Sequence, residues 1–151
     1  QTLTATFTLP SASYFLRVEN NDGNAVRSSS AILSASSAPA FSTGAGSIGS
    51  VSAGSTVALT VSASSDSAVT IAETTSVLTS NSDTPNSTMN LSLSGTPATS
   101  ATYNITGTAP SPTGEKTYTF SLSATDAESQ VTTREFSITV SVGINNSGQF
   151  N

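Results

Sequence analysis

The sequence contains no cysteine, no histidine and no tryptophan. Without cysteine there is no disulfide and no thiolate, and without histidine there is no imidazole base and no His-ligated zinc. Ser-His-Asp and Cys-His catalysis are therefore excluded. A pair of carboxylates can hydrolyse a glycosidic bond only beside a sugar-binding cleft, and three tyrosines offer little to line one. We therefore expect a protein that is not an enzyme.

Charged residues are also scarce, at 9% of the chain, with a net charge of −5 and only four cations. Four cations are too few to bind a phosphate backbone, so no nucleic-acid partner is expected. No apolar run approaches the ~20 residues that a membrane-spanning helix needs, so no membrane insertion is expected. The chain opens directly into strand-like sequence at Gln1, without the charged and apolar regions of a signal peptide.

Serine and threonine dominate what is present, with 31 Ser and 25 Thr. A chain of low charge rich in these residues can be disordered, but the apolar residues recur at every second position in nearly every segment. That period is typical of half-buried β-strands. A chain of 151 residues can hold one full β-sandwich, or one sandwich and part of another.

Residues 1–36 predict three strands, over 2–10, 13–19 and 25–33, with a hairpin turn at Asn20-Asn21-Asp22-Gly23 before the last of them. Three strands with so few large apolar side chains bury too little surface to offset chain entropy, so this segment needs a neighbour. Residues 34–39 are small and polar and end in proline, as short connectors do, and we place a domain boundary after residue 36.

Residues 37–143 show apolar runs separated by turn clusters at roughly the 8–12-residue spacing of a sandwich or barrel. They predict an all-β, antiparallel β-sandwich of about seven strands. The expected strands include residues 57–61, 69–71, 89–93 and 103–105, followed by a long hairpin over 115–142. Residues 144–151 are turn-rich and are expected to be a tail or linker.

The hairpin over 115–142 has the most regular alternation in the chain. On its second arm Val131 has an odd number, whereas the apolar residues from Phe136 onward have even numbers. A β-bulge near residues 133–135 would bring both sets to the buried face. The buried face of the first arm is expected to carry Tyr118, Phe120, Leu122 and Ala124.

Three segments resemble known Ig-like modules. Residues 118–140, YTFSLSATDAESQVTTREFSITV, resemble the terminal strands of cadherin-like Ig repeats, and residues 38–49, APAFSTGAGSIG, resemble the start of the same repeat. The usual Gly-Leu-Ser segment between them is missing, and residues 91–97 are only a loose counterpart. Residues 14–26, YFLRVENNDGNAV, resemble the closing hairpin of a TIG/IPT-type Ig domain. The resemblance implies an Ig-like sandwich preceded by a partial, three-strand Ig-like segment.

This order of modules is similar to that of large structural proteins of tailed phages and of secreted bacterial adhesins. It implies surface display, self-assembly or attachment without catalysis, at an extracellular site or on a virion surface. One hypothesis is a phage virion structural protein, a fibre or decoration module, that contacts protein subunits of the same assembly. The other is a bacterial surface adhesin that binds a cell-surface glycan or calcium.

Asp126 and Glu128, in Ala-Thr-Asp-Ala-Glu-Ser, resemble a motif that binds Ca²⁺ in some cadherin-type domains. Ca²⁺ takes six to eight oxygen ligands, so another loop would have to help, through Asp66 or Asp22. The alternative is that Asp126 and Glu128 are solvated residues that favour a turn. No cofactor other than this Ca²⁺ is expected.

Three apolar residues of the first segment are candidates for a protein interface. On its predicted strand Phe15 points to one face, and Leu16 and Val18 are assigned to the other face. An aromatic residue that is exposed on an incomplete sheet suggests burial against another chain or domain. Phe7 and Leu9 alternate with threonine in residues 2–10. We expect a strand of a neighbouring subunit to complete this sheet and to bury all three, which makes the protein oligomeric or part of a larger chain.

Overall fold

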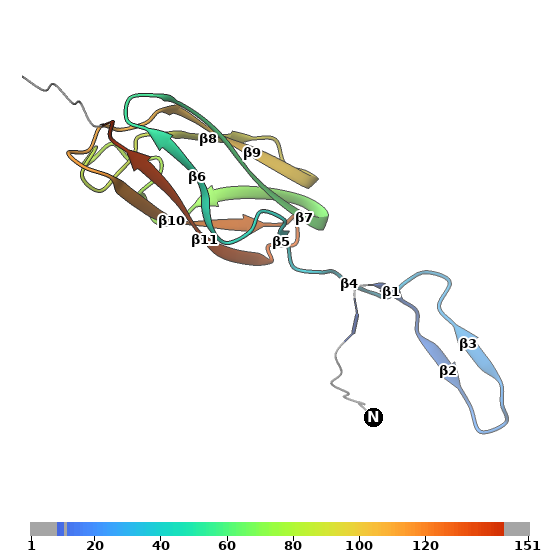
Figure 1. Ribbon diagram of the computed structural model, residues 1–151. Helices are drawn as coiled ribbons and strands as arrows, with labels where there is room; N and C mark the ends of the chain where they lie inside the picture. Colours follow the sequence, from blue (N-terminus) through green and yellow to red (C-terminus); the bar gives the residue numbers. More distant parts are fainter. Residues whose placement is uncertain (1–8, 11, 144–151) are drawn as a thin grey trace, which may run out of the picture. The chain divides into compact units, whose positions relative to one another are not determined.

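The computed structural model describes residues 9–10 and 12–143, and every regular element in this range is a β-strand (Figure 1). The prediction of an all-β chain is confirmed. In this part of the chain there is no helix with the length and hydrophobicity of a membrane span. The chain divides into two compact units, Gln1–Ser37 and Ala38–Asn151, which we call unit 1 and unit 2.

Unit 1 is a long hairpin that pairs in two separate antiparallel ladders. β1 (Ala12–Tyr14) pairs with β4 (Leu33–Ala35), and β2 (Arg17–Glu19) pairs with β3 (Ala25–Arg27). The expected strands over 13–19 and 25–33 are therefore each interrupted. The reason lies in the register, because Tyr14 pairs with Leu33 and Arg17 pairs with Arg27. The returning strand therefore has more residues between the two ladders than the outgoing strand has.

The hairpin turn predicted at residues 20–23 is confirmed. The Gly23 N–H donates to the Asn20 carbonyl at 3.1 Å, and the Asn20 side chain accepts the N–H groups of Asp22 and Asn24 at 3.1 and 3.0 Å. Gly23 has a φ of 79°, which glycine adopts without steric cost. The strand predicted over residues 2–10 lies almost wholly outside the described residues.

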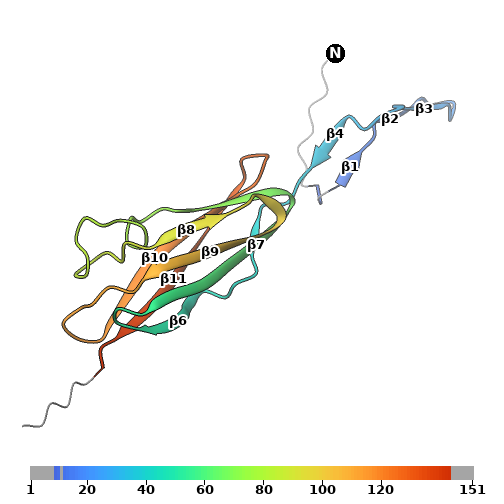
Figure 2. The same cartoon turned by 90° about the horizontal axis from the view of Figure 1, so that it is seen from above.

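Unit 2 is a two-layer β-sandwich, as predicted (Figure 2). One layer contains β5, the first half of β7, β9 and β8, and the other contains β6, β11, β10 and the second half of β7. All neighbours are antiparallel except β6 and β11, which are parallel. The strands are β5 (Ala40–Phe41), β6 (Gly46–Ser52), β7 (Thr56–Glu73), β8 (Ser92–Gly95), β9 (Ala98–Thr108), β10 (Lys116–Thr125) and β11 (Val131–Ser141).

β7 runs through both layers, where the sequence predicted two strands separated by a turn. Residues 56–64 pair with β9, and residues 70–73 pair with β10. The pairing with β9 shifts register between Ser64 and Val69, in the serine-rich stretch that separates the two predicted strands over 57–61 and 69–71. That stretch therefore bends a continuous strand from one layer to the other.

The core lies between the layers and consists of side chains that are at most 6% exposed. The buried face predicted for β10 from side-chain alternation is confirmed. Within the core, the rings of Phe120 and Phe136 pack with their centroids 6.3 Å apart. Phe41 meets Phe136 edge-on at 5.4 Å. The largest fully buried side chains are Tyr118, Phe120, Phe136, Leu78, Met89, Ile105, Leu122 and Ile138.

The predicted β-bulge near residues 133–135 is wrong. β10 and β11 pair without a register shift from Lys116, opposite Val140, to Thr125, opposite Val131. Even-numbered residues of β11 face inward throughout, and Val131 simply points outward with 56% exposure. An exposed valine costs less than a disrupted ladder, so the strand stays regular.

Arg134 takes the inward position next to Phe136, where the sandwich reaches its end. It is half-buried, and its Nη1 donates to the carbonyl oxygens of Phe41 at 3.0 Å and Thr43 at 2.7 Å. The guanidinium therefore caps the core and ties the start of unit 2 to β11. Buried carbonyl groups need such donors because leaving them unpaired is costly.

The connection between β7 and β8, residues 74–91, contributes to the core without belonging to the sheet. The strand predicted over residues 89–93 is wrong in its first half, since Met89 and Leu91 are buried but precede β8. Their N–H groups bond within the connection, to the carbonyls of Val77 and Leu78 at 2.8 and 2.9 Å. The Tyr118 hydroxyl also donates to the Pro85 carbonyl, which holds the connection against β10.

Candidate metal centre

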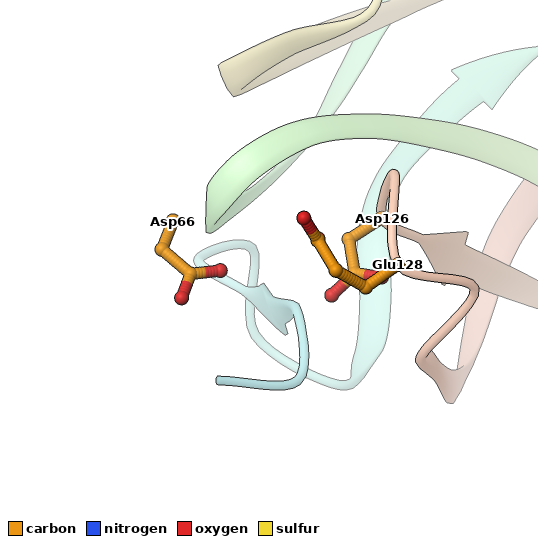
Figure 3. A group of neighbouring side chains, drawn as sticks. All are labelled: Asp66, Asp126 and Glu128. Carbon is orange, nitrogen blue, oxygen red and sulfur yellow. The ribbon is translucent and has the colours of Figure 1, made fainter. Parts of the chain in front are cut away.

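Three carboxylates gather at the end of the sandwich where β7 changes layer. Asp66 lies on the bend of β7, and Asp126 and Glu128 lie on the turn between β10 and β11 (Figure 3). One carboxylate oxygen from each residue lies within 4.8 Å of the others. Asp126 is 5% exposed, whereas Asp66 and Glu128 are exposed.

The strand alternation of β10 explains why Asp126 is buried. Even-numbered residues of β10 face the core, and Asp126 occupies the next even position after Ala124. The turn that follows depends on its side chain, because Asp126 Oδ1 accepts the Gln130 N–H at 2.8 Å. Asp126 therefore helps to form the turn, as the alternative interpretation expected, but it is buried and not solvated. It also supplies a carboxylate to the cluster.

Serine hydroxyls join the β7 bend to the β10–β11 turn. Ser65 Oγ lies 3.5 Å from Asp126 Oδ2. Ser67 Oγ donates to the Glu128 carboxylate and accepts the Ala127 N–H at 3.2 Å. These contacts fix the separation of the acidic residues on the two elements.

The oxygen donors in this cluster are of the type that Ca²⁺ prefers. Ca²⁺ binds oxygen ligands at 2.3–2.6 Å, so two oxygens on opposite sides of one ion are about 5 Å apart. Carboxylate oxygens within 4.8 Å of one another fit around one such ion. Asp66, Asp126 and Glu128 would hold it, and carbonyls or water would have to complete the six to eight ligands.

One of the two suggested helper residues, Asp66, belongs to the same unit as this cluster. Asp66 joins Asp126 and Glu128, whereas Asp22 belongs to the hairpin turn of unit 1. The sequence did not single out Ser65 and Ser67 as contact residues. The stretch Ser64-Ser65-Asp66-Ser67 has the composition of a turn, but only the passage of β7 between layers sets it against the β10–β11 turn.

The candidate interface residues lie in unit 1. Phe7 falls outside the described residues, and Leu9 is half-buried. Phe15 is 41% exposed, and the Arg27 guanidinium lies over its ring at 3.8 Å from the centroid. Phe15 is therefore covered in part by a cation of its own hairpin.

The chain is similar in fold to solved Ig-like structures. The BIgI domain of beta protein from S. agalactiae, solved bound to CEACAM1, matches with a TM-score of 0.50 and 24% identity over 70% of this chain and 98% of that domain. Titin domains Z1Z2 in complex with telethonin match with a TM-score of 0.48 and 18% identity, over 88% of this chain and 62% of that one. No protein-family model matches the chain, and no curated protein matches it. The fold is Ig-like, which confirms the predicted fold class.

Proposed function

We propose that this protein is a non-enzymatic structural module of a phage virion, a fibre segment or decoration module, that acts through protein–protein assembly. The observation that carries the proposal is the contrast between its units. Unit 2 has a closed core, whereas no residue of unit 1 within 9–10 and 12–37 is buried. A segment of this kind requires a partner surface to become stable.

The Ig-like fold supports an interaction role. The BIgI domain, which is similar in fold, is bound to the protein CEACAM1 in its solved structure. The composition adds to this, because a chain without histidine and cysteine lacks the usual general bases and nucleophiles. A virion location and an extracellular one both fit a low-charge, hydroxyl-rich surface, and the virion is the one we propose.

The proposal is tested on native particles that carry the chain. An antibody raised against residues 38–143 is used to isolate these particles, which are then imaged by electron microscopy with immunogold labelling. We expect gold at regular positions on virion heads, tails or fibres. Labelled bacterial cell surfaces without labelled virions would overturn the virion proposal and favour a surface adhesin.

A calcium-binding adhesin is the second candidate, and the cluster of Asp66, Asp126 and Glu128 is the observation that favours it. Ca²⁺ in such a site would join the β7 bend to the β10–β11 turn and oppose separation of the two layers. It would also neutralise part of the acidic charge, since three carboxylates that face one another repel. A cell-surface glycan is a further ligand for such a protein, and saturable binding of the chain on a glycan array would reveal it.

We expect Ca²⁺ to raise the melting temperature of the chain by several degrees, because a ligand that binds only the folded state stabilises it. Circular dichroism melts are recorded up to about 10 mM Ca²⁺, above the dissociation constants of about 0.1–1 mM found in extracellular calcium modules. Asp66→Asn should abolish the increase in melting temperature, because it removes one of the three carboxylates. It should leave the fold intact, because Asp66 is exposed and outside the β10–β11 turn. Glu135→Gln, an exposed position on β11, should retain the increase.

Asp126→Asn is a second variant for the same test, because the asparagine Oδ1 can still accept the Gln130 N–H. Mg²⁺ at equal concentration controls for ionic strength. An unchanged melting temperature throughout the Ca²⁺ titration would exclude the metal site.

A further inference from the structure

The first half of β10 has a neighbouring strand on one side only. β11 pairs with the whole of β10, whereas β7 pairs only with Leu122–Thr125. Two hydrogen bonds extend the contact with β7 by one residue, because the Thr74 N–H donates to the Ser121 carbonyl at 2.9 Å and the Ser121 N–H donates to Thr75 Oγ1 at 3.1 Å. Before Ser121, the side of β10 that faces away from β11 has no strand partner among residues 9–10 and 12–143.

The chain leaves this edge because Glu73 draws it into a turn. The Glu73 carboxylate accepts three consecutive N–H groups, those of residues 77–79. Ser76 has a φ of 58°, which lies outside the range of a β-strand. The chain after Thr75 therefore bends away and does not extend β7 along the first half of β10.

The exposure of the outer face of β10 follows the missing strand. Its odd-numbered residues all point to this face, and Ser121, Ser123 and Thr125 are half-buried where the chain of β7 flanks them. Thr117 and Thr119 are exposed. Alternate residues of a strand direct their N–H and C=O groups to the same side, so those of Thr117 and Thr119 point away from β11, as those of Ser121 do. Within the described part of the chain no hydrogen bond to these backbone groups is found, so the edge is open.

A pocket adjoins the open edge at the start of β10. It has a volume of about 260 Å³ and is lined by Pro85, Asn86 and residues 112–116. A pocket of this size holds one side chain, and it is smaller than the ~300–1,000 Å³ of sites for drug-sized ligands. Lys116 belongs to the lining and directly precedes Thr117, so a segment that lies along the edge can place a side chain in the pocket.

The Lys116 amine gives this pocket a positive group without an ionic partner. The amine lies 5.7 Å from the centroid of the Tyr118 ring, and no ion pair or hydrogen bond to it is found among residues 9–10 and 12–143. Asp83 lies within electrostatic range, but its carboxylate accepts hydrogen bonds from an amide and a hydroxyl of its own turn. Glu115, the other charged residue of the lining, is exposed. The amine is therefore available to a carboxylate from outside the chain.

We propose that the open edge of β10 binds an extended segment of a partner protein, and that an aspartate or glutamate of this segment enters the pocket beside Lys116. The backbone of an extended segment complements the unpaired groups of Thr117 and Thr119, because strands pair through N–H and C=O groups at the same spacing. A carboxylate complements the Lys116 amine. The inference rests on the proposed function, since it names a surface for protein–protein assembly.

An NMR titration of the full ¹⁵N-labelled chain with the probe peptide acetyl-Thr-Val-Thr-Glu-Thr-Val-Thr-amide tests the inference. We expect the amide signals of Lys116, Thr117 and Thr119 to shift, and the Thr117 and Thr119 amides to exchange hydrogen more slowly in the bound state. The dissociation constant should be about 0.1–5 mM, because the contact is much smaller than the ~800 Å² per partner of a standard interface. The same peptide with lysine in place of glutamate should bind about threefold more weakly or worse.

The matched variants change the edge at one position. Thr119→Pro removes an N–H that points to the open edge, where proline is tolerated because no ladder hydrogen bond is lost. It should raise the dissociation constant about tenfold or more. Thr119→Val keeps the N–H and the β-branched shape, and it should bind as the native chain does.

Lys116→Gln tests the pocket and should remove the preference for the glutamate peptide over the lysine peptide. Circular dichroism melts show whether each variant is folded. Should Thr119→Pro not fold, hydrogen exchange of the native chain and the Lys116→Gln titration still decide the result.

An absence of amide shifts up to about 10 mM peptide, or unchanged affinity in Thr119→Pro, would overturn the inference. Equal affinity for the glutamate and lysine peptides would overturn the role of Lys116. The same amide shifts on concentrating the chain without peptide would identify a second copy as the occupant and overturn the partner assignment. Gold-labelled virions without peptide binding would refute only the docking edge, and peptide binding with gold only on cell surfaces would refute only the virion location.

Discussion

Replacing Phe136 with alanine is expected to destabilise unit 2 by about 3–5 kcal/mol, a large part of the roughly 5–15 kcal/mol that stabilises a domain. Phe136 is 0% exposed and lies between Phe41 and Phe120 at the end of the core. The alanine removes both ring contacts and leaves a cavity that a rigid sandwich cannot fill. Urea denaturation of the full chain, followed by circular dichroism, measures the loss.

Val131→Ala is the matched control, since it truncates an apolar residue on the same strand. Val131 is 56% exposed on the outer face, and its loss should change the free energy of unfolding by about 0.5 kcal/mol or less. The two variants together also test the register of β11. With a β-bulge near residues 133–135, Val131 would face the core and its truncation would be costly, so a large effect there would contradict the continuous ladder.

Replacing Glu73 is expected to loosen the connection between β7 and β8. Glu73 Oε1 accepts the N–H groups of Val77 and Leu78 at 2.6 and 2.7 Å, and Oε2 accepts the N–H and hydroxyl of Thr79 at 2.9 and 2.7 Å. One half-buried carboxylate thus organises the first turn of this connection. Glu73→Ala leaves these donors to water, and we expect a loss of about 2 kcal/mol.

Glu73→Gln separates the two carboxylate oxygens. The amide oxygen can still accept from Val77 and Leu78, but the amide nitrogen then faces the donors of Thr79, so about half of the loss is expected. Glu135→Gln is the control, because Glu135 is exposed and no hydrogen bond to its side chain is found among residues 9–10 and 12–143. A Glu73→Gln variant as stable as Glu135→Gln would contradict this role of the carboxylate.

The contribution of Glu73 should also depend on pH. Partial burial alone would raise its pKa, but the hydrogen bonds from Leu78, Thr79 and Val77 outweigh burial and lower the pKa below its usual 4.5. A lowered pKa in the folded state means that the stabilisation is complete above pH 4.5 and is lost as the pH falls through the folded-state value. The stability difference between the native chain and Glu73→Ala should therefore be largest near neutral pH and should shrink in acid. Urea denaturation of both chains at neutral pH and at acidic pH measures this difference.

Much of the sandwich could be predicted from alternation alone. The buried face of β10 follows directly from residues 118, 120, 122 and 124, because a strand places every second side chain on one face. The turn at residues 20–23 follows from local chemistry, since asparagine and glycine tolerate its backbone angles. Such features depend on neighbours in sequence, so the sequence reveals them.

The errors arose where the outcome depends on residues far apart in sequence. Parity suggested a bulge in β11, yet the Phe41 and Thr43 carbonyls accept hydrogen bonds from Arg134, which makes a polar residue acceptable at an inward position. Met89 and Leu91 alternate like strand residues, but they bond to the carbonyls of Val77 and Leu78 instead of to a sheet neighbour. Alternation reports burial, and it does not report which partner a strand finds.

The sequence by itself determined an all-β chain without histidine or cysteine chemistry, and it singled out Asp126 and Glu128 on one turn. The tertiary structure decided that Asp66 stands beside them and that the Val18 and Val26 side chains of unit 1 are exposed. The physical reason is the same in both cases. Side-chain alternation is a local property of the backbone, whereas the passage of β7 between layers and the covering of a sheet face depend on how distant segments pack.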